Sequence, residues 1–217
     1  MAVLCDFDDT IAVQNVAQLL LQRFGHGKWQ ELRARLRQKE INFREYQERA
    51  FDDVAASEHE MRDFVKQEVI VRPGFQEMWH HCQAGGIPLA IVSLGLDFYI
   101  DAVMEREQLS PVTAYTVETS FTPQGIRYYY PHIWDGCIQW GTCKCSILRS
   151  YRWAGYSVAY IGDGTSDFCP ASRAEMVFAR SKLAEKCLSS GVPYLDFQDF
   201  HQVLEGLQRA EEGGRAR

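Results

Sequence analysis

The sequence of 217 residues contains no apolar run as long as a membrane span, and it begins on a predicted strand rather than on a signal-peptide pattern. It also lacks an excess of basic charge, because 29 acidic residues stand against 23 lysines and arginines, a formal net charge of −6. We therefore expect no membrane partner and no nucleic-acid partner, since a broad nucleic-acid surface requires clustered positive charge. The length suits one large domain or a core with a smaller insert.

The seven cysteines are an odd number and include no pair at C-x2-C spacing. A disulfide framework is not indicated, so we predict a reduced, cytoplasmic protein. Cys137, Cys143 and Cys145 lie close together in the sequence with His132 nearby, which makes a zinc site the alternative to a cluster of reduced thiols. The unpaired spacing favours reduced thiols, and whether the three cysteines bind a metal stays open.

Hydrophobic periodicity predicts strands that alternate with helices. The predicted strands cover residues 2–6, 88–93, 113–118, 157–161, 175–179 and 192–195; the predicted helices cover 75–84, 97–107, 145–154 and 197–209, with a short one after Asp167. Such alternation is typical of a doubly wound, mostly parallel sheet, so we expect an α/β, Rossmann-like core. The aromatic- and proline-containing segment 119–141 is predicted to be a flap or β-hairpin, and the polar tail 211–217 to be disordered.

Between the first two predicted strands the pattern is helical throughout. Residues 12–71 carry apolar side chains at spacings of three and four, and Ser57 with Glu60 forms a capping box before the last helix. We interpret 12–71 as a helical cap inserted into a core of residues 1–11 and 72–210. The basic run from Arg33 to Lys39 is predicted to be a solvated helix face, because Leu32 and Leu36 are interleaved with it at helical spacing.

Acidic residues follow two of the predicted strands. Asp6 and Asp8 come at the end of the first strand, and Asp163 and Asp167 come after the strand at 157–161. Ligands of open parallel sheets bind at the carboxyl ends of the strands, so these carboxylates are expected to share one crevice. Crowded carboxylates repel one another unless a cation or a proton intervenes, and oxygen ligands suit Mg²⁺. The pattern therefore predicts a magnesium-assisted phosphoryl site.

Two further residues complete the predicted site. Ser93 ends a hydrophobic strand before Gly95 and can hold a phosphate oxygen, and Lys144 at the start of a helix can supply a fixed positive charge. We predict Asp6 as the nucleophile and Asp8 as the acid that protonates the leaving alkoxide and then takes a proton from the attacking water. Asp163 is expected to ligate the metal directly, while Asp167 orients the ligand shell.

The ordered set Asp6-x-Asp8-x-Thr10, Ser93, Lys144 and Gly162-Asp163-x3-Asp167 resembles the haloacid dehalogenase-like hydrolases, most of which are phosphatases. The resemblance implies that the backbone carbonyl of Asp8 also ligates Mg²⁺. A helical insert at 12–71 is similar to the C1-type caps of phosphoserine phosphatase relatives.

The later motifs narrow this resemblance. The loop Gly162–Ala171 is similar to that of phosphoethanolamine/phosphocholine phosphatases, and the cysteine-bearing segment before Lys144 also resembles the 2-hydroxy-3-keto-5-methylthiopentenyl-1-phosphate phosphatases. Phosphoserine phosphatases carry, nine residues after the nucleophile, a glutamate that receives the substrate ammonium; here that position is Asn15, a candidate specificity residue. No acidic residue lies between Asp9 and Glu31. We therefore favour an uncharged, sugar-like or keto phosphate.

A cationic substrate remains the alternative to an uncharged one. It would need an aromatic cage, for which Tyr128, Tyr129, Tyr130, Trp134 and Trp140 are the candidates. The predicted partner is thus a small phosphorylated metabolite. A phosphotransferase or mutase, and a non-catalytic binding protein of the same fold, are the alternative functions, and the choice between monomer and homodimer is not decided.

Overall fold

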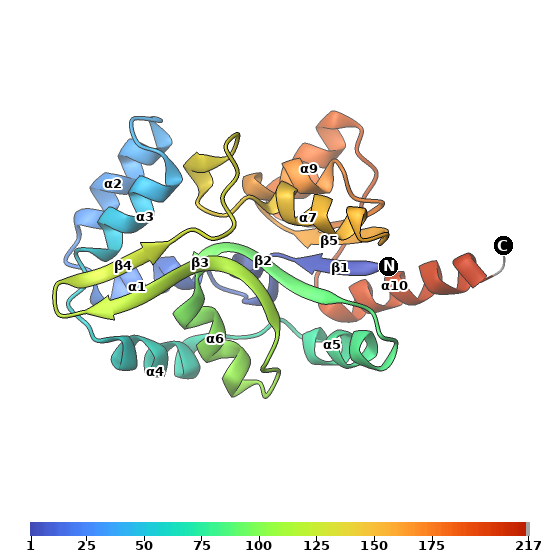
Figure 1. Cartoon of the computed structure of the whole chain (residues 1–217), viewed down its shortest axis with the longest axis horizontal. Coiled ribbons are helices and arrows are strands. Elements are labelled where there is room, and N and C mark those ends of the chain that lie inside the picture. Colours follow the sequence, from blue (N-terminus) through green and yellow to red (C-terminus); the bar gives the residue numbers. More distant parts are fainter. Residues whose placement is uncertain (216–217) are drawn as a thin grey trace.

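A mostly parallel sheet runs through the middle of the molecule (Figure 1) in a computed structural model that describes residues 1–215. Its strands lie in the order β4-β3-β2-β1-β5-β6-β7, and within this sheet only the β3–β4 pair is antiparallel. The expected α/β, doubly wound architecture is therefore confirmed. The strands are β1 (Ala2–Cys5), β2 (Leu89–Leu96), β3 (Thr113–Thr122), β4 (Gly125–Tyr129), β5 (Val158–Gly162), β6 (Met176–Ala179) and β7 (Leu195–Asp196).

Helices cover both faces of the sheet. Successive residues of each strand point to opposite sides, so apolar residues at consecutive positions need helices on both faces to bury them. Val3 and Cys5 of β1 pack toward α5 (Phe75–Ala84), α6 (Asp97–Arg106) and α10 (Phe200–Arg215). Leu4, the residue between them, packs toward the helices on the other face: α7 (Lys144–Trp153), α8 (Phe168–Ala171) and α9 (Ser181–Ser190). Burial on both faces explains why the central strands are continuously apolar.

The segment between β1 and β2 forms helices, as predicted: α1 (Val16–Phe24), α2 (Lys28–Arg37), α3 (Phe43–Phe51) and α4 (Glu58–Glu68). The capping box of Ser57 and Glu60 is confirmed at the start of α4. Helices α2 and α3 lie beyond the carboxyl end of β1, whereas α4 runs beside α6 (Figure 1). Arg62 and Lys66 of α4 both form ion pairs with Glu105 of α6. The division into core and cap stays an interpretation, and α4 is tied to the core side.

The C-terminal region differs from the prediction. Helix α9 was not expected, the last strand is Leu195–Asp196 rather than 192–195, and the last helix begins at Phe200. The prediction of a disordered tail from residue 211 is wrong for its first part, because α10 continues to Arg215. Glu211 lies on this helix, and His81 Nε2 is 3.0 Å from Glu211 Oε1, so a long-range contact holds a stretch that reads as polar. Residues 216–217 of the predicted tail lie outside the described residues.

The predicted flap at 119–141 is a hairpin followed by a loop. Strands β3 and β4 pair from Glu118–Tyr129 to Thr122–Gly125, with Gly125 at φ 119° in the turn. The remainder returns toward the sheet, where the Cys143 amide donates to the carbonyl of His132 at 2.8 Å. This return delivers Lys144 to the start of α7.

The register of the central strands brings the motif residues to one edge. Cys5 of β1 lies between Ile91 of β2 and Ile161 of β5. Strands β1 and β5 end directly after this register, so Asp6 and Asp163 follow them at the same edge of the sheet, whereas β2 continues to Leu96. In the part of the chain described, no helix is both long and apolar enough to cross a membrane.

Candidate active site

The chain makes a wide turn directly after β1. The turn spans Phe7–Ile11 and is closed by the Ala12 amide, which donates to the carbonyl of Phe7 at 2.9 Å. Arg72 holds this turn from outside: its Nε donates to the carbonyl of Thr10 at 2.7 Å, and its Nη2 to that of Asp9 at 2.9 Å. Asp9 itself adopts φ 60°, a left-handed conformation that aspartate tolerates. Asp6 immediately precedes this turn, so the turn fixes the position of its side chain.

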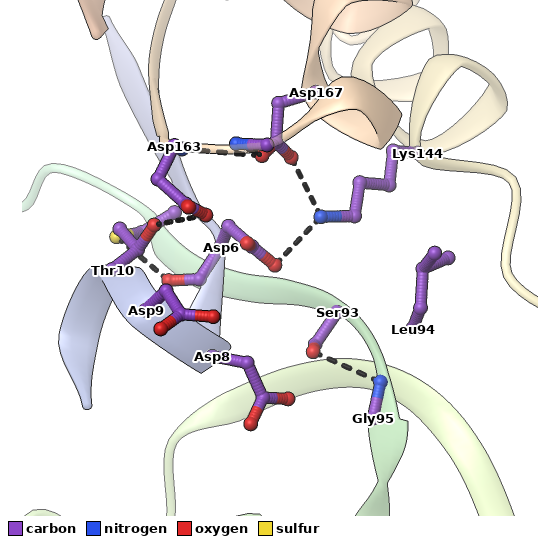
Figure 2. Close-up of polar contacts among 12 residues, drawn as sticks. Asp6, Asp8, Asp9, Thr10, Ser93, Leu94, Gly95, Lys144, Asp163 and Asp167 are labelled. Carbon is purple, nitrogen blue, oxygen red and sulfur yellow. Dashed lines mark hydrogen bonds and ion pairs between the residues drawn. The ribbon is translucent and has the colours of Figure 1, made fainter. Parts of the chain in front are cut away.

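Asp6, Asp163 and Asp167 converge on one point (Figure 2), with carboxylate oxygens that all lie within 4.8 Å of one another. Lys144 lies against this cluster, and its Nζ donates to Asp6 Oδ1 and to Asp167 Oδ1, each at 2.6 Å. The structure thus brings together residues predicted from three separate motifs. A single lysine charge faces three carboxylates, so the cluster retains an excess of negative charge.

Hydrogen bonds occupy both oxygens of Asp167, which is completely buried. Oδ1 accepts from Lys144 and from the hydroxyl of Tyr160, and Oδ2 accepts from the amides of Asp163 and Gly164. A carboxylate has room for about four such donors. Asp167 is therefore placed to hold Lys144 and the Asp163 loop in position.

The pKa values reflect this crowding. Burial raises the pKa of the Asp6 carboxyl well above its usual range, and the negative charge of Asp167 raises it further. Burial and the Asp167 charge likewise raise the pKa of Asp163 to about 7. Burial alone lowers the pKa of Lys144, but the charges of Asp167 and Asp6 outweigh it and the net pKa is raised. The lysine therefore stays charged, and a proton or a further cation would relieve the repulsion among the carboxylates.

The residues present fit a magnesium ion. The candidate ligands are oxygens only, as Mg²⁺ requires, and they are crowded and partly buried. Asp6 and Asp163 are the side chains best placed to hold the ion, because hydrogen bonds already occupy both Asp167 oxygens. The hydroxyl of Thr10 donates to Asp163 Oδ1 at 3.3 Å and so connects the turn after β1 to the Asp163 loop.

The Asp8 carboxylate lies apart from this cluster, on the side of Ser93 and Gly95 (Figure 2). It accepts from the hydroxyl of Tyr99 at 2.8 Å and from the amide of Val16 at 2.6 Å. Burial raises the pKa of Asp8 to about 6, while these two hydrogen bonds limit the rise. A role for Asp8 in metal binding would therefore use its backbone carbonyl, and its side chain is left for proton transfer.

Ser93 lies inside β2, three residues before its end rather than at its end as the sequence predicted, and is almost completely buried. Its Oγ accepts from the Gly95 amide at 3.0 Å, which leaves its hydroxyl proton available as a donor. Gly95 is needed here, because a Cβ at this position would lie 2.1 Å from the hydroxyl oxygen of Tyr99. Of the predicted phosphate-holding pair, Lys144 contacts Asp6, and Ser93 lines the same cleft.

A cleft of about 1390 Å³ opens above these residues, between the strand ends and helices α1–α3. Its inner end is lined by the motif residues, and its wall on the helical side carries Leu36, Ile41, Phe43, Tyr46 and Trp140. The ring of Phe43 lies 6.2 Å from that of Tyr46 and 6.1 Å from that of Trp140, centroid to centroid. This end of the cleft is apolar and aromatic.

Asn15, the predicted specificity residue, lines the cleft, but its amide is engaged on both sides. Its Oδ1 caps α1 by accepting from the Gln18 amide at 3.0 Å, and its Nδ2 donates to Asp9 Oδ2 at 3.1 Å. The structure therefore gives Asn15 a helix-capping contact, and its role in specificity stays a prediction.

The candidate aromatic cage is not assembled around the cleft. Of its five residues, only Trp140 is among those that line it. The Arg44 guanidinium lies 3.9 Å from the Tyr130 ring centroid, and that of Arg149 lies 4.6 Å from the Trp134 ring centroid. Arginine side chains of the protein itself thus lie over two of the rings.

The cysteines differ from the expected cluster of reduced thiols. Cys145 forms a disulfide with Cys169, which had not been included in the cluster, while Cys137 and Cys143 are free. The loop after Asp167 folds back onto the start of α7 and brings these distant positions together. The disulfide thereby joins the segment that carries Lys144 to the one that carries Asp167.

Residues without a motif complete the site. Tyr99 and Tyr160 hold the carboxylates of Asp8 and Asp167, Arg72 holds the turn after β1, and Gln47 of α3 donates to the carbonyl of Leu94 at 3.0 Å. Each acts over a large sequence separation or from a buried apolar face, where no local pattern distinguishes it from a core residue.

The sequence profile of the haloacid dehalogenase-like hydrolases matches residues 3–172. The chain belongs to this family. The 2-hydroxy-3-keto-5-methylthiopentenyl-1-phosphate phosphatase of Geobacillus kaustophilus is 33% identical over 215 residues, 97% of each chain. That of Brevibacillus brevis is 30% identical over 218 residues, 98% of this chain and 97% of the relative.

Solved structures show the same family fold. A phosphoserine phosphatase with a phospho-aspartyl intermediate analogue superposes with a TM-score of 0.70 at 15% identity, over 94% of this chain and 97% of that one. A probable phosphoserine phosphatase from Vibrio cholerae gives a TM-score of 0.73 at 18% identity, over 98% of this chain and 67% of that one. At these identities the likeness concerns the fold.

Proposed function

We propose that this chain is a phosphatase that hydrolyses a small phosphomonoester metabolite, with Mg²⁺ as cofactor and Asp6 as the nucleophile. The observation that carries the proposal is the contact of Lys144 with both Asp6 and Asp167 at 2.6 Å, beside Asp163. The contact supports the proposal because Asp6, the proposed nucleophile, and Asp163, the proposed metal ligand, lie around one point with the buried cation Lys144. Phosphoryl transfer needs this combination, because its catalysis is mainly positioning and charge neutralisation.

The reaction takes place in two halves. An Asp6 oxygen attacks the phosphorus in line, the ester P–O bond breaks, and Asp8 donates its proton to the departing alkoxide. Water then attacks the aspartyl-phosphate, Asp8 takes the proton back, and inorganic phosphate leaves with Asp6 regenerated. Lys144 and Ser93 hold the phosphoryl oxygens. When bound by Asp6 and Asp163, Mg²⁺ supplies positive charge that offsets the repulsion between the Asp6 carboxylate and the phosphate.

The cleft favours a leaving group without positive charge. Glu40 and Glu45 are the acidic residues of its helical side, and each has a local partner: Glu40 pairs with Arg35, and Glu45 caps α3 at the Asn42 amide. On the same side, Phe43 and its apolar neighbours can receive an apolar group. A keto phosphate with a methylthio tail, the substrate named for the two relatives, fits both features, and we propose this class for the chain.

Phosphate release from a panel of esters, with Mg²⁺ and with a chelator, tests the proposal. The panel contains phosphoserine, phosphoethanolamine, phosphocholine, sugar phosphates and 2-hydroxy-3-keto-5-methylthiopentenyl-1-phosphate. We expect metal-dependent turnover with the keto ester as the best substrate. Phosphate release that continues in the presence of the chelator would contradict the metal assignment. No release from any ester of the panel would favour a phosphotransferase or a binding protein.

A further inference from the structure

Gln47 connects the helical insert to the catalytic edge of the sheet. It lies on α3, is only 3% exposed, and donates from Nε2 to the carbonyl oxygen of Leu94 at 3.0 Å. Leu94 follows Ser93, the predicted phosphate-holding residue, and both line the cleft together with Gln47. The amide of Gln47 is therefore next to the inner end of the cleft, where the phosphate ester would lie.

The orientation of this amide follows from its partner. A backbone carbonyl only accepts hydrogen bonds, so the nitrogen side of the Gln47 amide must face Leu94. The oxygen side, Oε1, is then directed elsewhere, and it is buried without a hydrogen-bond partner among the described residues. Leaving a buried acceptor unpaired is costly, at about 1–3 kcal/mol, so such an atom in a ligand cleft requires an explanation.

Two other polar side chains that line the cleft are engaged. Asp8 accepts from Tyr99 and Val16, and Asn15 is bonded to Asp9 and to the Gln18 amide. Gln47 Oε1 differs from them because this acceptor has no hydrogen-bond donor among the residues that the structure describes. The group that completes it must be a donor, and a neutral one suits a cleft whose acidic side chains are already paired.

We infer that Gln47 recognises the substrate: its Oε1 accepts a hydrogen bond from a hydroxyl on the carbon adjacent to the one that bears the phosphate ester. The inference rests on the proposed phosphatase function and specifies its substrate further. Leu94 links Gln47 to the phosphate-holding Ser93, so the hydroxyl that reaches Oε1 must lie close to the ester oxygen. Esters without this hydroxyl leave Oε1 unpaired and are hydrolysed less efficiently.

The test compares two esters that differ only in this hydroxyl, 2-hydroxypentyl phosphate and pentyl phosphate. In the wild-type protein we expect kcat/KM to be about tenfold higher for the hydroxylated ester, the effect of one hydrogen bond to a buried group. In Gln47→Met, which keeps the length of the side chain and removes the acceptor, the two values should become nearly equal. Gln67→Met, the same substitution on the exposed face of α4, should keep the wild-type preference.

The ratio separates recognition from a structural role. A loss of packing or of the contact with Leu94 would lower kcat/KM for both esters by the same factor and would overturn the inference. Gln47→Leu, which also removes the acceptor, serves as a second variant if Gln47→Met does not fold, and retention of the wild-type preference in it would also contradict the assignment. Equal values for the two esters in the wild-type protein would overturn it without any variant. If the wild-type protein hydrolyses neither ester but releases phosphate from others of the panel, the inference alone is wrong; silence on every ester refutes the proposed function.

Discussion

Replacing Lys144 by methionine should destabilise the folded protein strongly, because this lysine is the buried cation of the site. Its side chain is 3% exposed, and those of its partners Asp6 and Asp167 are 9% and 0% exposed. Lys144→Met keeps an unbranched side chain of similar length but leaves two buried carboxylates without their counter-charge. Removing one partner of a buried ion pair costs about 3–5 kcal/mol, since the remaining charge is uncompensated.

Lys66→Met is the matched control. Lys66 also contacts a carboxylate, Glu105, at 3.0 Å, but the two side chains are 37% and 43% exposed. Solvent screens such a pair, which is worth about 0–1 kcal/mol. For a chain of this size, roughly 2–4 °C of melting temperature corresponds to 1 kcal/mol, so we expect a fall of about 6–20 °C for Lys144→Met and of no more than about 4 °C for the control.

Thermal unfolding of both variants should be measured in the presence of a chelator, because a bound metal would stabilise the folded state by mass action. In the activity assay, Lys144→Met should also lower kcat by about 10²–10³, the usual cost of removing a group that stabilises transition-state charge. Equal melting temperatures for the two variants would refute the reasoning, since they would show that the buried charges are compensated in another way.

Three further predictions concern the nucleophile, the Asp8 contact and a core thiol. Asp6→Asn should abolish phosphate release while circular dichroism shows an intact fold; unchanged turnover in a pure preparation would exclude Asp6 as the nucleophile. Gly95→Ala places a Cβ 2.1 Å from the Tyr99 hydroxyl oxygen and should displace this hydroxyl from Asp8. We expect kcat to fall about tenfold or more, because the contact of the proposed general acid is disturbed. Gly213→Ala, whose added Cβ meets open space, should leave kcat unchanged. Burial raises the pKa of Cys82 from 9.0 to about 11. Its contribution to stability is therefore complete below pH 9 and falls between pH 9 and 11, where the unfolded thiol loses a proton that the folded one retains. Site-resolved alkylation should leave Cys82 unmodified at pH 8 in the folded protein; rapid modification there would contradict its burial.

Local pattern was sufficient for most elements of the sheet. The strands β1, β2, β3, β5 and β6 were predicted to within a few residues because apolar runs between turn signals mark strands. The predictions failed at the C-terminal end, where the contact of His81 with Glu211 belongs to packing between α5 and α10. Helix α9 was missed because its buried residues, Leu183, Ala184 and Cys187, occupy a narrow stripe within an otherwise polar segment.

The sequence by itself determined which residues can carry the chemistry: Asp6, Asp8, Asp163 and Asp167 come after strands that end at one edge, Lys144 begins a helix, and Ser93 lies in β2. Only the tertiary structure decided how these groups are used. It turned the Asp8 carboxylate toward Tyr99, filled both oxygens of Asp167, joined Cys145 to Cys169 and placed Gln47 beside Leu94. The physical reason is that periodicity and motif spacing depend on near neighbours in the chain. The direction of a side chain and the partner of a buried polar group depend instead on residues that packing brings from far away.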